Sequence, residues 1–124
     1  MKHLFFILIF LFIINYSYSQ SLEEKSVFLE QLIEQISEET DEELDFTELY
    51  ESLEYYYKHP ININNCRKED LEELHFLNSF QIEKLFQHIE KNGKLLSYLE
   101  LQSVRGFDMQ TIENLRSFSA ISSI

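Results

Sequence analysis

The residues best placed to bind a ligand lie in two short connections, His75-Phe76-Leu77-Asn78 and Arg105-Gly106-Phe107-Asp108. Each connection ends in a residue, Asn78 or Asp108, whose side chain is of the type that caps the first turn of a helix. The free amide groups and the positive dipole end of a helix N-terminus together form a site for anions. Anion binding by the backbone is therefore the chemistry that these connections offer.

No pattern for catalysis or metal binding accompanies them. The chain has no Gly-rich phosphate loop, no nucleophile elbow and no paired-carboxylate motif. His59, His75 and His88 have no cysteine or carboxylate partner at metal-ligand spacing, and the acidic run from Glu38 to Asp45 lacks the residue order of a calcium loop. We therefore predict a protein that is not an enzyme, with no catalytic residues, metal, cofactor or small-molecule substrate.

Both connections belong to an internal repeat with a period of thirty residues. Each copy predicts a short helix, a tight connection and a second helix, so the two copies form two helical hairpins packed as one unit. The repeated positions in the two copies are Leu71, Leu74, Leu77, Ile82, Glu83 and Leu85, then Leu101, Val104, Phe107, Ile112, Glu113 and Leu115.

Local signals place four helices in this repeat. The first is predicted from Lys68 to His75. The second opens at Asn78, with Gln81 three residues on, and closes at Asn92-Gly93, where glycine can take a left-handed conformation. The third opens with a full capping box from Ser97 to Glu100, and the fourth begins at Asp108.

Two segments of the repeat resemble the tandem helix-hairpin-helix domain of ComEA-type DNA-binding proteins. They are ININNCRKEDLEEL and KNGKLLSYLELQSVRGFDMQTIENL. The matching features are the extended start from Ile61 to Asn64, the Asn92-Gly93 pair and the helix start from Ser97 to Leu101.

The resemblance implies that the hairpins hold phosphates of duplex DNA through backbone amides, without reading bases. Carried over to this chain, the contacts would come from the two hairpins, with support from Lys84 and Arg105. The hairpin residues are Leu77, Asn78 and Ser79 in the first copy, then Gly106, Phe107, Asp108 and Met109 in the second.

The chain departs from the family at the hairpins themselves. The family has Gly-apolar-Gly, whereas this chain has Phe76-Leu77-Asn78 and Gly106-Phe107-Asp108, so glycine is missing at three of four positions. We expect Phe76 to place a bulky ring at one phosphate position and the Asp108 carboxylate to compete for the amides at the other. Two functions follow: weak, sequence-independent binding to duplex DNA, or a protein-interaction or assembly role that has replaced it.

The first nineteen residues have the pattern of a secretory signal peptide. Lys2 precedes an apolar run of eleven residues, LFFILIFLFII, which ends before the small residues Ser17 and Ser19. The run is too short to span a bilayer of roughly 30 Å. We predict cleavage near Gln20, export to the periplasm or the extracellular space, and no stable membrane insertion afterwards, with a retained signal anchor as the alternative.

The remaining chain is predicted to be all-α, with an acidic helical pair at 20–59, the tandem helix-hairpin-helix domain at 60–118 and a tail at 119–124. The pair consists of a helix from Leu22 to Ser37 and one that opens with a capping box at Asp45 and stops near Lys58. Residues 20–59 contain thirteen acidic and two basic residues, against nine and seven in 60–124. This acidic segment either slows the encounter with DNA by repelling phosphate or, as we favour for most of it, is the solvated face of the two helices.

Three further features have two interpretations each. Tyr55-Tyr56-Tyr57 is either a stacking platform for bases or, as we favour because of its acidic neighbours, packing against the repeat. Cys66 is either a reactive thiol or, as we favour, a small buried side chain. Five basic residues form either a basic patch or, as we favour, scattered surface charge. They are Lys84, Lys91, Lys94, Arg105 and Arg116.

Overall fold

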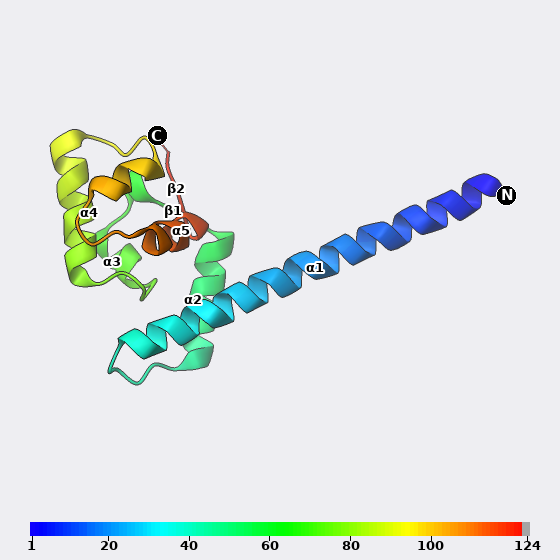
Figure 1. Cartoon of the computed structure of the whole chain (residues 1–124), viewed down its shortest axis with the longest axis horizontal. Helices are drawn as coiled ribbons and strands as arrows, with labels where there is room; N and C mark the ends of the chain where they lie inside the picture. The colour runs from blue at the N-terminus through cyan, green and yellow to red at the C-terminus, as the bar shows by residue number, and fades with distance from the viewer. Residues whose placement is uncertain (123–124) are drawn as a thin grey trace. The chain divides into compact units, whose positions relative to one another are not determined.

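The computed structural model describes the backbone of residues 1–122 and the side chains of residues 1–14 and 22–122 (Figure 1). The chain forms two compact units, Met1–Asp41 and Glu42–Ile124. Both are helical, and the strands within the described residues are two segments of two residues each. The predicted all-α class is therefore confirmed.

The first unit contains one helix, α1 (Lys2–Glu39). Its sequence has no glycine or proline, so no residue in the segment breaks the helix. The helix predicted from Leu22 to Ser37 lies inside α1, which starts much earlier because the preceding apolar segment is helical too. Within the described residues, no helix combines the length and the apolar composition needed to cross a membrane.

The second unit contains all the remaining elements of the described chain. In order they are α2 (Phe46–Lys58), β1 (Ile61–Asn62), the 3-10 helix η1 (Ile63–Asn65), α3 (Lys68–Glu72), α4 (Ser79–Asn92), the 3-10 helix η2 (Tyr98–Ser103), α5 (Met109–Ser117) and β2 (Ser119–Ala120). Strands β1 and β2 pair in parallel, with Ile61 opposite Ser119. The start of the predicted tail therefore pairs with the extended start of the repeat (Figure 1).

Several predicted helix ends agree with the structure because they depend on local capping. The Asp45 carboxylate accepts a hydrogen bond from the Glu48 amide at 3.1 Å and so opens α2. Helix α2 ends at Lys58, as predicted from the following proline. Helix α4 ends at Asn92, and Gly93 takes a positive φ of 86°.

Two predicted helices in the repeat are wrong in detail. Helix α3 ends at Glu72 rather than His75, because His75 takes a left-handed φ of 63° that an α-helix does not allow. The segment after Ser97 is the 3-10 helix η2, not an α-helix. The predicted capping box is incomplete there, since the Glu100 carboxylate accepts a hydrogen bond from the Leu96 amide at 3.1 Å.

The apolar positions of the repeat form the core of the second unit. All ten are buried, while Glu83 and Glu113 at the repeated acidic position are exposed. Helix α3 packs on α4, and η2 packs on α5. Leu77 and Phe107 lie within the two hairpin connections and are buried, so their side chains attach these connections to the core.

The tyrosines and Cys66 behave largely as the packing interpretation predicts. The Tyr56 hydroxyl donates to the Glu73 carboxylate, and the Tyr57 ring packs edge-on against Phe118 with 6.1 Å between centroids. Cys66 is half-buried rather than fully buried, because it lies at the end of η1 and not inside a helix core. Burial raises the pKa of its thiol to about 11, so the reactive thiolate is scarce at neutral pH.

The Asn64 side chain holds the beginning of the repeat against the link between the hairpins. Its amide oxygen accepts from the Leu95 amide at 2.7 Å, and its amide nitrogen donates to the Leu95 carbonyl at 2.9 Å. The same nitrogen donates to the Ser122 carbonyl at 3.2 Å. One side chain thus substitutes for backbone pairing between three segments.

The Gln81 side chain joins the two hairpins. Its oxygen accepts from the Asn78 amide at 2.8 Å, and the Asn78 side chain accepts in return from the Gln81 amide at 2.8 Å. The Gln81 side-chain nitrogen then donates to the Gly106 carbonyl at 2.8 Å. The predicted Asn78 cap is therefore confirmed, and the same glutamine that completes it also holds the second connection in place.

We predict that Gln81→Ala destabilises the protein by about 1 to 2 kcal/mol, because it removes part of the α4 cap and the bond to Gly106 together. The matched control is Gln87→Ala on the same helix, whose side chain makes only exposed contacts of 3.3 Å. That change should cost about 0.5 kcal/mol or less. Urea unfolding followed by circular dichroism measures both, and equal losses would show that Gln81 does not join the hairpins in solution.

Candidate nucleic-acid interface

The second hairpin keeps a glycine where its backbone needs one. Gly106 has a φ of 91°, in the region that side-chain-bearing residues rarely adopt. A Cβ at this position would lie 3.2 Å from Gln81 Cγ and 3.3 Å from Phe80 Cδ1. Gly106 therefore allows both the turn and the close approach of this connection to the start of α4.

Asp108 caps the helix that follows. Its carboxylate accepts from the Thr111 amide at 2.7 Å, and this hydrogen bond holds the pKa of the Asp108 carboxyl below its usual range. Met109 and Gln110 supply the first two amides of α5, which have no acceptor inside the helix because of their position. An anion at this end would share the site with the Asp108 carboxylate.

The first hairpin has a different backbone. In the first hairpin the residue with a positive φ is His75. In the second hairpin it is Gly106, which corresponds in the repeat to Phe76 and so lies one position later. Asn78 and Asp108 have the same extended backbone, with φ of −83° and −89°. The shift of the turn to His75 shows how the chain forms this connection without glycine.

Phe76, which we expect at a phosphate position of the first hairpin, has a ring contact with the core. Its ring is half-buried and packs against the buried Phe118 ring, with 5.7 Å between centroids. This contact holds one side of the ring against the core of the second unit. The obstruction of the first hairpin by Phe76 and the competition of the Asp108 carboxylate for the second both stay predictions.

The predicted hairpin residues divide into two groups. Leu77 and Phe107 are buried, so their side chains cannot reach a ligand. The exposed members, which lie at the two helix starts, are Asn78, Ser79, Gly106, Asp108 and Met109. Because Gln81 bonds to Gly106, these two helix starts lie beside each other on one surface.

Sequence reasoning missed one residue of this surface. Phe80 in the first turn of α4 is 50% exposed and lies next to Gly106. The Lys84 ammonium group sits 5.5 Å from the centre of its ring. An aromatic residue one turn before a lysine on a predicted helix was the signal that could have identified Phe80. The second copy of the repeat has a glutamine, Gln110, at the matching position, so the repeat pattern did not single out Phe80.

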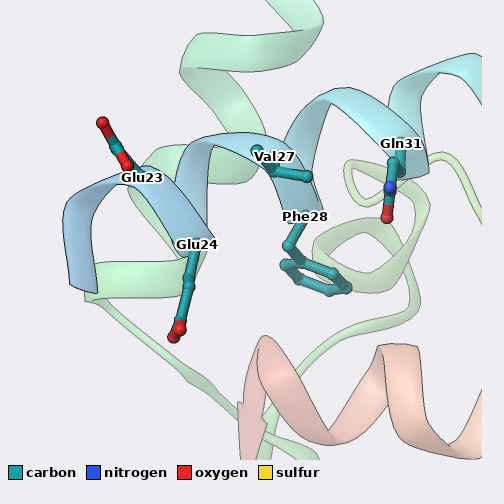
Figure 2. A pocket seen from close by; sticks show the side chains of 5 residues that line it. All are labelled: Glu23, Glu24, Val27, Phe28 and Gln31. Carbon is teal, nitrogen blue, oxygen red and sulfur yellow. The ribbon is translucent and has the colours of Figure 1, made fainter. Parts of the chain in front are cut away.

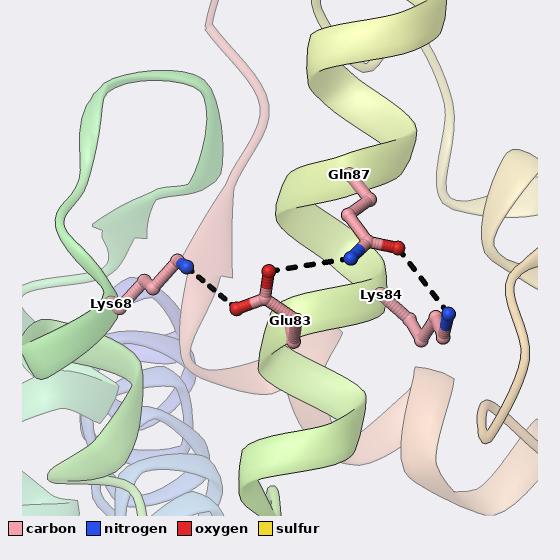
Figure 3. A network of polar contacts seen from close by, with 4 residues as sticks. All are labelled: Lys68, Glu83, Lys84 and Gln87. Carbon is pink, nitrogen blue, oxygen red and sulfur yellow. Dashed lines mark hydrogen bonds and ion pairs between the residues drawn. The ribbon is translucent and has the colours of Figure 1, made fainter.

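The two supporting basic residues differ in their surroundings. Lys84 donates to the Gln87 side chain at 3.3 Å, and Gln87 donates in turn to Glu83 at 3.3 Å. Glu83 completes the chain of contacts by pairing with Lys68 at 2.6 Å (Figure 3). Arg105 is exposed beside Gly106. Lys84 and Arg105 also line one shared depression with Lys91, so these three charges gather, contrary to the scattered arrangement that we favoured.

A different depression lies on α1, where Glu23, Glu24, Val27, Phe28 and Gln31 project from neighbouring turns of the helix (Figure 2). Two of its lining side chains are carboxylates and none is cationic. Such a surface repels phosphate, so it does not extend the anion-binding surface of the hairpins.

Comparison with known proteins supports the interpretation of the repeat. A family model described as the helix-hairpin-helix motif matches residues 57–119, about half of the chain. Motifs of this kind are common in nucleic-acid-binding proteins. No curated protein and no solved structure matches the chain at a significant level. The chain belongs to the helix-hairpin-helix motif family.

Proposed function

We propose that the second unit binds the backbone of duplex DNA without sequence preference, as the resemblance to ComEA-type proteins implies. The observation that carries this proposal is the pairing of two capped helix starts, α4 and α5, on one surface. The amides of Ser79 and Phe80, and those of Met109 and Gln110, are the first two of each helix. Amides at these positions have no acceptor within the helix, and the helix dipole favours a negative charge beside them.

The affinity should be low. The Asp108 carboxylate occupies the α5 start, and the whole chain carries a formal net charge of −12. Two or three phosphates neutralised by cations such as Lys84 and Arg105 give a salt dependence with a slope of about −2 to −3 in log affinity against log salt. The dissociation constant should lie in or above the non-specific range of ~10⁻⁴ to 10⁻⁶ M.

A protein-interaction or assembly role is the second candidate. The observation that favours it is the exposure of two leucines that flank the start of η2, with Leu96 81% and Leu99 72% exposed. Large apolar side chains that lie close together on a surface are often covered by a partner. In this account the hairpins keep their shape but serve to hold a protein.

The proposed location is outside the cytoplasm, and the proposed action is binding without catalysis. The N-terminal segment directs export, cleavage occurs near Gln20, and the mature protein acts outside the cytoplasm without a stable membrane anchor. The protein acts by binding alone and catalyses no reaction. The support for export is the Lys2 start, the apolar run and the small residues Ser17 and Ser19.

We predict that Asp108→Gly tightens binding to duplex DNA at low salt, because it removes a carboxylate from the α5 amides. The matched control is Asp45→Gly, which removes the cap of α2 at a distance in sequence from the hairpins and changes the net charge equally. Fluorescence anisotropy with a labelled duplex should show a gain for the first variant and little change for the second. If neither the parent nor Asp108→Gly binds while both remain helical, the protein-interaction role replaces the DNA proposal.

We also predict that the mature protein begins at Gln20 or Ser21. The full chain would be expressed in a bacterium with an export pathway, and the exported protein would be sequenced from its N-terminus. Replacing both small residues, as Ser17→Arg with Ser19→Arg, should block this cleavage, since the processing site needs small side chains. Recovery of the unchanged chain with Met1 intact on the membrane would contradict the prediction.

A further inference from the structure

A depression runs along α4 and continues to the second hairpin. Its polar lining comes from Lys84, Gln87, His88, Lys91 and Asn92 on α4 and from Ser103 and Arg105 near the end of η2. Its volume is about 460 Å³. None of its lining residues is acidic, although acidic residues outnumber basic ones in the chain as a whole.

The contacts around the depression keep its charge positive. Glu83, one turn before Gln87 on α4, pairs with Lys68 on α3, outside the depression, and its other oxygen accepts a hydrogen bond from the Gln87 side chain (Figure 3). This pairing lowers the pKa of the Glu83 carboxyl, in keeping with a carboxylate whose charge is locally balanced. Lys84 is steered by its contact with Gln87. Three cations therefore share one concave surface that lacks a carboxylate of its own.

The spacing of these cations suits a nucleic-acid strand. Lys84 and Lys91 are seven residues apart on α4, so they lie on one face, separated by about 10 Å along the helix axis. This separation equals the axial rise of about three nucleotides in one strand of a duplex. Arg105 borders both the depression and Gly106, so the depression begins where the hairpin surface ends.

We propose that this depression holds two or three phosphates of the strand that the hairpin amides contact, and so extends the DNA footprint along α4. The proposal rests on the proposed function, because the hairpins fix where the strand enters. The chemistry is ionic at Lys84, Lys91 and Arg105, with hydrogen bonding from the polar groups between them. An acidic polypeptide would meet the same cations, but it would not need the adjoining hairpin amides.

The test is the salt dependence of binding to a labelled duplex, measured by fluorescence anisotropy. The variant Lys84→Gln with Lys91→Gln removes two cations from the depression, so the slope of log affinity against log salt should become shallower by about 1.8. The matched control is Lys58→Gln with Arg67→Gln. It removes the same charge from two residues that pair with Glu54 and Asp70 outside the depression, and it should leave the slope nearly unchanged.

Each outcome decides between the claims. Equal slopes for the two double variants, in a protein that binds duplex and responds to Asp108→Gly, would overturn the extended footprint but leave hairpin binding intact. A parent protein that binds no duplex at low salt would remove both proposals. If labelled polyglutamate binds more tightly than duplex and needs Lys84 and Lys91, the depression is a site for an acidic polypeptide, and our assignment to nucleic acid is wrong.

Discussion

The second unit depends on the side-chain amide of Gln81. A primary amide has both an acceptor and donors, so it can complete the α4 cap at Asn78 and still donate to the Gly106 carbonyl. Neither a carboxylate nor an apolar side chain could satisfy both partners. Glycine at 106 is the matching requirement, because a Cβ there would crowd Gln81 Cγ at 3.2 Å. This contact places the two helix starts on one surface, and the DNA-binding proposal uses that arrangement.

Much of the fold could be predicted because its determinants are local. The apolar period of the repeat identified the ten buried positions, and caps at Asp45, Asn78 and Asp108 are set by residues within one turn. The errors occurred where distant residues decide the geometry. The link that leads into η2 is held by Asn64, thirty-one residues from Leu95, and β1 finds its partner at the far end of the unit. The periodic spacing of apolar residues does not predict contacts between segments so far apart in the sequence.

The candidate site was predictable only in part for the same reason. The resemblance named the hairpin residues, but the position of the Phe76 ring depends on Phe118, which is forty-two residues away in the sequence. Likewise, nothing in the spacing of Lys91 and Arg105 indicates that they line one depression. The structure shows a core contact for Phe76 and places three of the five basic residues, Lys84, Lys91 and Arg105, around one depression. The Asp108 carboxylate caps α5 as expected, by accepting a hydrogen bond from the Thr111 amide.

The central claim is that backbone amides at two helix starts hold phosphate, and amide chemical shifts test it most directly. The nitrogen-15 spectrum of the protein would be recorded at low salt while duplex DNA is added. The account predicts that the largest changes occur at the amides of Ser79, Phe80, Met109 and Gln110, because a phosphate there would accept hydrogen bonds from them. Changes that leave these four amides unaffected, or no change at any amide, would contradict the account.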